Sequence, residues 1–169
     1  MSLKRQFQSF AAYNAWANQR LYGAAGDLPA ADFTRDLGAF FGSLAGTLNH
    51  IAMADALWLK RLTGRAYVEV TRLDFVFSTE LPLLWKARED LDRLLAEMVA
   101  GFSDADLDVE VDYTTMTRGA ARNRRADIIQ HLFNHQTHHR GQAHGLLSQL
   151  RPGVEPPSLD LIYFLNIRE

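Results

Sequence analysis

The chain has 169 residues, a length that fits a single domain (residues 1–169) whose core is large enough to fold without cross-links. Apolar residues make up 47% and charged residues 22% of the sequence, proportions typical of an ordered globular protein. The formal net charge of −2 argues against non-specific nucleic-acid binding, and the absence of cysteine excludes disulfides, thiolate nucleophiles and cysteine-based metal centres.

The first predicted helix covers residues 2–22. Apolar residues recur there at spacings of three and four, which is the pattern of an amphipathic helix. Asn14 lies on this stripe, where an apolar residue is expected. Glycines and a proline within residues 23–29 end the helix, and a short helical piece is expected over residues 30–37.

Two long helices are expected in the middle of the chain. Ser43 is a favourable N-cap residue, and the apolar stripe that follows it runs to Gly64, which is placed as a C-terminal stop. The next helix begins near residues 78–79, holds Pro82 in its first turn, where proline is tolerated, and ends at Gly101.

The hydrophobic period changes before the last long helix. Between residues 107 and 122, apolar residues alternate with acidic ones, which favours a short β-hairpin or an extended crossover. A fourth long helix is expected over residues 123–150, and the apolar run at residues 159–165 is expected to pack back on the helices. Together these elements predict an all-α fold, an antiparallel four-helix bundle.

Histidines are concentrated on the fourth predicted helix, which carries five of the six in the chain. Without cysteine, a transition-metal site must be made from histidines and carboxylates. His135 and His139 are four residues apart, so they share one helix face and can bind the same ion. At 100° per residue they fall in the middle of the stripe expected to face the core. The pair alone leaves a metal site and two hydrogen-bonded structural histidines equally open.

A third ligand must come from another helix. His50 is the only histidine outside the fourth helix, and it lies midway along the second long helix beside core-forming residues. Three histidines from two facing helices make an open site, with solvent or substrate in the remaining positions. A structural role for His50 is an equal alternative. The H-E-x-x-H motif of zincins is absent, because Gln136 follows His135.

A basic cluster near the start of the fourth helix contains Arg118, Arg122, Arg124 and Arg125. Five acidic residues precede it within residues 104–112. A mixed-charge surface is therefore favoured over a phosphate or RNA site, and no nucleic-acid partner is expected.

The location of the protein is expected to be cytoplasmic, without membrane association. The first ten residues, MSLKRQFQSF, lack the apolar segment of a signal peptide. The sequence also lacks a run of 18 or more apolar residues.

Four stretches of the sequence resemble one known family. NHQTHHRGQ at residues 134–142 looks like the signature of the DinB/YfiT-like family of metalloenzymes. Three further stretches agree with it: YNAWANQRL at residues 13–21, SLAGTLNHIAMADALWL at residues 43–59 and PPSLDLIYFL at residues 156–165. The resemblance therefore covers nearly the whole chain.

The resemblance implies a four-helix bundle with a hairpin or extended link before the last long helix, and it also implies a homodimer. It implies a divalent metal held by three histidines, and imidazole ligands suit zinc, nickel, iron and copper. At the matching positions these are His50, His135 and His139. His131 aligns with a family histidine outside the three ligands, and it is expected either to support a ligand from behind or to line the pocket.

The family also includes thiol-dependent transferases and a thiol-dependent isomerase. The resemblance therefore implies a metal-dependent transferase or hydrolase that acts on a small molecule, with a low-molecular-weight thiol as a further cofactor. A dimeric bundle in which the metal has a structural or sensory role is the alternative. Catalytic residues stay unassigned: Tyr13, Asn14, Asp55 and Gln142 are candidates for a general base by position alone.

Overall fold

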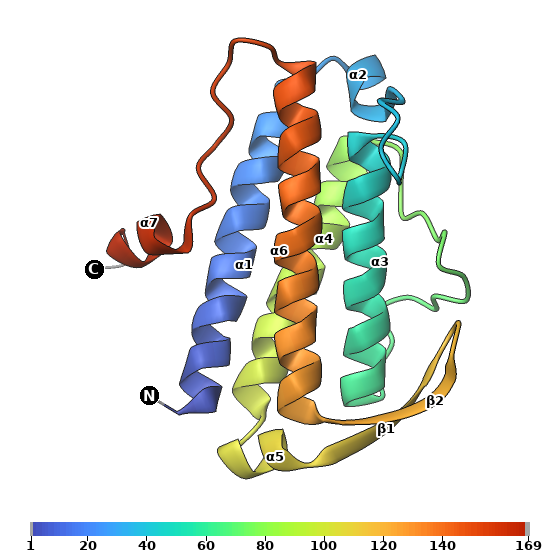
Figure 1. The fold of residues 1–169 in the computed structure, drawn as a ribbon, viewed down its shortest axis with the longest axis vertical. Helices are drawn as coiled ribbons and strands as arrows, with labels where there is room; N and C mark the ends of the chain where they lie inside the picture. Colours follow the sequence, from blue (N-terminus) through green and yellow to red (C-terminus); the bar gives the residue numbers. More distant parts are fainter. Residues whose placement is uncertain (1, 168–169) are drawn as a thin grey trace.

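Four long helices form the body of the protein in a computed structural model that describes residues 2–167 (Figure 1). They are α1 (Leu3–Gly26), α3 (Leu44–Thr63), α4 (Leu81–Gly101) and α6 (Arg125–Leu150). Three short helices and a two-stranded sheet connect or flank them: α2 (Ala30–Thr34), α5 (Asp104–Asp108), α7 (Leu161–Asn166), β1 (Glu110–Thr115) and β2 (Gly119–Arg124). The predicted four-helix bundle with a hairpin before its last long helix is confirmed.

The four long helices surround one core, and each packs against two of the others. Helix α1 packs against α4 and α6, and α3 packs against α6 and α4. The pairs α1–α4 and α3–α6 run antiparallel, whereas α3–α4 and α1–α6 run parallel (Figure 1). The parallel pairs arise because residues 64–80 return along the side of the bundle before α4 starts.

Helix boundaries follow the local capping signals of the sequence. The Ser43 hydroxyl accepts a hydrogen bond from the backbone N–H of Gly46 at 3.1 Å, and Gly64 ends α3 in the left-handed conformation with φ of 73°. Pro82 lies in the first turn of α4, where its missing N–H leaves no helical hydrogen bond unmade. The predicted limits of α3 and the predicted end of α4 at Gly101 are therefore confirmed.

Helix α1 is longer than predicted, because it continues through the glycines that were expected to end it. Gly23 and Gly26 lie against the indole ring of Trp85, and Ala25 is buried between them. A glycine inside a helix costs about 1 kcal/mol relative to alanine, and this packing offsets the cost. Conversely, α2 ends at Thr34, three residues short of the predicted piece.

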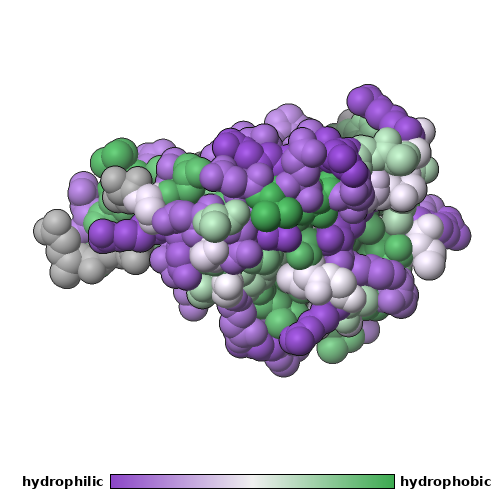
Figure 2. Space-filling model, turned by 90° about the horizontal axis from the view of Figure 1, so that it is seen from below, coloured by the Kyte–Doolittle hydropathy of each residue, from purple (hydrophilic) through white to green (hydrophobic). Residues whose placement is uncertain are grey.

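The hairpin crosses below the lower ends of α6 and α3 (Figure 1). Its register pairs Glu110 with Arg124 and Thr115 with Gly119. Acidic partners neutralise two arginines of the basic cluster: Arg122 binds Asp112 at 2.6 Å, and Arg124 lies 3.2 Å from a carboxylate oxygen of Asp108. The lower end of the molecule is accordingly mostly hydrophilic, with apolar residues in separate patches (Figure 2).

The C-terminal tail returns to the bundle as predicted. Helix α7 packs against α1, where Phe164 meets the rings of Tyr13 and Trp16. The Tyr13 hydroxyl also donates a hydrogen bond to the carbonyl of Leu159 at 2.6 Å. Helices within residues 2–167 include none that is long and apolar enough to cross a membrane.

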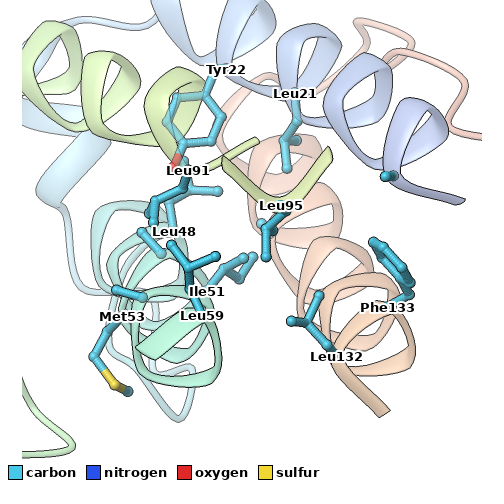
Figure 3. Close-up of a cluster of buried hydrophobic side chains, with 14 of the residues drawn as sticks. Leu21, Tyr22, Leu48, Ile51, Met53, Leu59, Leu91, Leu95, Leu132 and Phe133 are labelled. Atoms are coloured by element: carbon cyan, nitrogen blue, oxygen red, sulfur yellow. The ribbon is translucent and has the colours of Figure 1, made fainter. Parts of the chain in front are cut away.

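The apolar core is made by leucine and aromatic side chains from all four long helices. Leu21, Leu48, Leu91 and Leu132 each come from a different helix and point toward the shared interior (Figure 3). Each is almost completely buried, so their removal from water is the main drive for bundle formation.

A layer of polar side chains interrupts this core at mid-height and also draws on all four helices. Arg88 on α4 donates to Asp55 on α3 at 2.6 Å and lies 3.1 Å from Asp92 one turn further along α4. On the other side of the bundle, Arg140 of α6 donates to Gln136 at 3.2 Å. We call the following residues the buried polar network: Asn14, Asn18, Asp55, Arg88, Asp92, Gln136 and Arg140.

The charges of the buried polar network balance, since two arginines face two aspartates. Asn14 and Asn18 join the two halves: their amide groups donate to Asp92 at 3.1 and 3.0 Å, and their carbonyl oxygens accept from Arg140. The Gln136 amide group donates to Asp55, which links α6 directly to α3. Buried charges are tolerated only when paired in this way.

Replacing Arg88 with methionine should destabilise the protein by about 3–5 kcal/mol, because it leaves two buried carboxylates without their shared cation. The double variant Arg88→Met Asp55→Asn removes one charge of each sign and should recover a large part of this loss. Urea unfolding at pH 7 measures both. Strictly additive losses would show that Asp55 and Arg88 are not energetically coupled.

Candidate metal centre

Three histidines from two antiparallel helices meet at mid-height of the bundle. His50 lies on α3, and His135 and His139 lie one turn apart on the facing side of α6. One ring nitrogen from each lies within 4.8 Å of the other two. The sequence-predicted trio is therefore brought together in space.

The distances between the rings suit binding of one shared metal ion. The Nε2 atoms of His50 and His135 are 3.2 Å apart, and the ring centroids of His50 and His135 lie 4.5 and 4.3 Å from that of His139. Two imidazole nitrogens bound at about 2.05 Å to one tetrahedral zinc ion are about 3.3 Å apart. The three side chains thus fit a single divalent ion as ligands.

Hydrogen bonding sets which nitrogen of His139 faces the centre. Its Nδ1–H donates to the side-chain oxygen of Gln142 at 2.7 Å, which leaves Nε2 as a lone-pair donor. The amide N–H of Gln142 in turn donates to His138 at 3.3 Å. Gln142 therefore acts as an orienting residue for His139, and not as the base considered from the sequence.

His50 is held by ring stacking instead. The ring of Phe41 stacks on it with centroids 4.0 Å apart and an angle of 20°, and meets His139 edge-on at 5.5 Å. The Nδ1 atom of His50 is buried and has no hydrogen-bond partner among residues 2–167. Phe41 thus forms an apolar wall over two of the three histidines.

Gly46 allows the loop that carries Phe41 to reach this position. A Cβ atom at residue 46 would lie 2.0 Å from the carbonyl oxygen of Phe41, a distance that no side chain can occupy. Gly46 is also one turn before His50 on α3. The close approach of loop and helix therefore places Phe41 directly above the His50 ring.

Burial keeps the three imidazoles uncharged. Burial and, to a smaller extent, the neighbouring His139 lower the pKa of His50 to about 4 and that of His135 to about 3. The pKa of His139 is also lowered by burial, although its bond to Gln142 opposes the change. Neutral imidazole is the form that binds a metal ion.

The prediction that His135 and His139 lie in the middle of the core-facing stripe of α6 is wrong. His135 and His139 are half-buried at the edge of the core-facing stripe, and the centre of that stripe is occupied by Gln136 and Arg140, which are 0% and 2% exposed. Both were missed because long polar side chains are rarely buried. In the sequence, the buried polar network was indicated by Asn14, a polar residue on the apolar stripe of the first helix.

The remaining histidines surround the trio without joining it. His131 packs edge-on against Trp58 with ring centroids 5.4 Å apart, and its ring lies 5.9 Å from that of His135. His144 points away from the site and bonds the carbonyl of Pro157 at 3.1 Å, as its helical angle predicts.

None of the positional candidates for a general base is free to act as one. Asp55 and Asn14 belong to the buried polar network, and the Tyr13 hydroxyl donates a hydrogen bond to the carbonyl of Leu159. Burial raises the pKa of Asp55 to about 6, although Arg88 beside it opposes the rise. These residues support the site structurally and do not present a base at its surface.

A model of the DinB family matches residues 1–169. The chain belongs to the DinB family. The family membership predicted from the motif at residues 134–142 is thereby confirmed.

Two DinB relatives are similar over most of their length. Protein DinB of Bacillus subtilis (strain 168) is 24% identical over 161 residues, which cover 93% of this chain and 93% of the relative. The crystal structure of a DinB-like protein from Bacillus cereus ATCC 10987 superposes with a TM-score of 0.66 at 20% identity, over 88% of this chain and 94% of that one. The second comparison shows that the two proteins share a fold.

Gly46→Ala should destabilise this DinB-family protein by roughly 1–3 kcal/mol, because the added Cβ collides with the backbone of Phe41. Gly145→Ala on α6 is the matched control: its Cβ meets nothing within 4 Å, so it should stabilise by about 0.5–1 kcal/mol. Urea unfolding measures both. Equal stability of the two variants would contradict the role assigned to Gly46.

The stability of the metal-free protein should fall as the pH drops below 6.5. His50 and His135 are neutral in the folded chain, with pKa values of about 4 and 3, but take up protons near pH 6.5 once unfolded. Their contribution is thus complete above pH 6.5 and is lost as the pH falls toward those lower values. His135→Gln should lose less unfolding free energy than the parent between pH 7 and pH 5. Equal losses in chelator-treated samples would contradict the lowered pKa of His135.

Proposed function

We propose that the protein is a metal-dependent enzyme that acts on a small molecule at a centre formed by His50, His135 and His139. The observation that supports this most is the convergence of three neutral imidazoles in a half-exposed position between α3 and α6. A closed structural zinc site usually has four protein ligands, whereas catalytic sites keep three and leave a position open.

A divalent ion held by His50, His135 and His139 would supply Lewis acidity and would lower the pKa of a bound water or thiol. The residues of the chain perform the remaining tasks. Gln142 holds His139 in the tautomer that leaves Nε2 available, and Phe41 excludes water from one side of the His50 ring. Gln136, next to His135 in the chain, donates a hydrogen bond to Asp55 on α3. This bond keeps His135 of α6 level with His50 of α3 along the bundle axis.

A thiol of low molecular weight is proposed as the second cofactor, which makes the reaction a thiol-dependent transfer or a hydrolysis. The chain has no cysteine, so any sulfur at the centre has to arrive with a cofactor or a substrate. Borderline divalent ions such as zinc and nickel bind thiolates well, and imidazole ligands suit the same ions.

Metal analysis of protein purified without a histidine tag tests the proposal. The parent should hold about one zinc, nickel or iron ion per chain, and the His135→Ala His139→Ala variant should hold less than about a tenth of that. His144→Ala is the matched control, because His144 lies on the same helix but faces the tail. Equal metal content in the parent and the double variant would contradict the centre.

A structural or sensory metal is the alternative, since an ion at this position also cross-links α3 and α6. Chelation separates the two functions. A structural ion contributes several kcal/mol, so its removal should lower the melting temperature by about 10 °C or more. If the ion is catalytic, the bundle is already stabilised by its core and its buried polar network. Chelation should then abolish activity with thiol and electrophile substrates and lower the melting temperature by much less.

A further inference from the structure

A small cavity lies beside the metal centre, between α3, α6 and the hairpin. Its volume is about 270 Å³, which is enough for one ring or a short side chain. It is lined by Trp58, Tyr113, Asn123, Asp127, Ile128 and His131. These residues come from α3, both strands of the hairpin and the first part of α6, and the centre proposed above does not use them.

A row of rings connects this cavity to the centre. From His135, the ring of His131 is 5.9 Å away, that of Trp58 is 5.4 Å further on, and that of Tyr113 follows at 5.2 Å. His131 is one turn before His135 on α6, a rise of about 6 Å. The cavity wall and the histidine trio are therefore neighbours on α6, and one ligand can reach both.

The aromatic walls are held in place before any ligand arrives. The guanidinium of Arg61 lies 4.6 Å from the ring centre of Trp58 and 5.4 Å from that of Tyr113, and it donates to the carbonyl of Thr114 at 2.8 Å. The Tyr113 hydroxyl donates to the side-chain oxygen of Asn123 at 2.8 Å. Such preorganisation reduces the entropy that binding costs.

The polar groups of the cavity favour an uncharged ligand. The carboxylate of Asp127 is already paired with Arg124 at 3.0 Å. The indole N–H of Trp58 and the ring nitrogens of His131 have no hydrogen-bond partner among residues 2–167, so they are available to a ligand. Aromatic walls with a few hydrogen-bonding groups suit a planar ring.

We propose that this cavity is the specificity subsite of the centre and takes a planar, uncharged aromatic group of the substrate. The reacting end of the same substrate then lies at His50, His135 and His139, so the inference rests on the proposed function. Binding of a remote, unreactive ring provides the interaction that holds the reacting end in place.

Three hydroxamic acids test the subsite by isothermal titration of the zinc-loaded protein. Hydroxamates bind an open metal position, and the three differ only in the attached group: methyl, 2-phenylethyl or 2-cyclohexylethyl. The phenyl compound should bind about tenfold or more tightly than the methyl compound, and more tightly than the cyclohexyl compound. Trp58→Leu and Tyr113→Leu should each remove most of the phenyl preference and leave the affinity for the methyl compound unchanged.

Trp16→Leu is the matched control, because Trp16 is a half-buried tryptophan that packs on α7, away from this cavity. It should keep the full preference for the phenyl compound. Equal binding of the phenyl and methyl compounds by the parent, or an equal loss in the Trp16 and Trp58 variants, would overturn the subsite while leaving the metal centre intact. Failure of all three compounds to bind would overturn the centre and the subsite together.

Discussion

The buried polar network is the interaction on which the rest of the molecule depends. Apolar contacts alone allow helices to shift along one another at a small cost in free energy. A buried carboxylate is stable only where it meets its hydrogen-bonding partner, so it defines one alignment of the helices. Asp55 on α3 binds both Arg88 of α4 and Gln136 of α6, so it determines how these three helices are aligned along the bundle axis. His135 is next to Gln136 in the chain, and its position opposite His50 therefore follows from this internal pairing.

The candidate centre is rigid on the side that faces the core and accessible on the side that faces solvent. Behind the imidazoles lies the charge-balanced network, and Phe41 covers one side because Gly46 lets its loop approach α3 closely. Toward solvent, His135 and His139 stay half-exposed beside the aromatic cavity. A site of this kind holds its ligands firmly without enclosing them, which is a requirement for binding an exchangeable substrate.

Local signals in the sequence predicted most of the fold and the identity of the three histidines. Ser43, Gly64 and Pro82 act through their own backbone chemistry, so their effect on helix limits is readable from the chain alone. The glycines near residue 23 misled the same reasoning, because the packing that overrides their cost comes from Trp85 on another helix. Phe41 carried no recognisable pattern, and Gln142 was considered only as a base, since the importance of both lies in which histidine they touch.

Three features can be read from the chain alone: the helical periodicity, the restriction of any metal site to histidines and carboxylates, and the family motif with its paired histidines. The packing of the helices determines which face of α6 is buried. It also makes α3 and α4 run parallel and brings Trp58, Tyr113 and His131 together in one cavity. The reason is physical: helical period and capping depend on neighbours a few residues away, whereas burial of Gln136 and Arg140 depends on partners that other helices contribute.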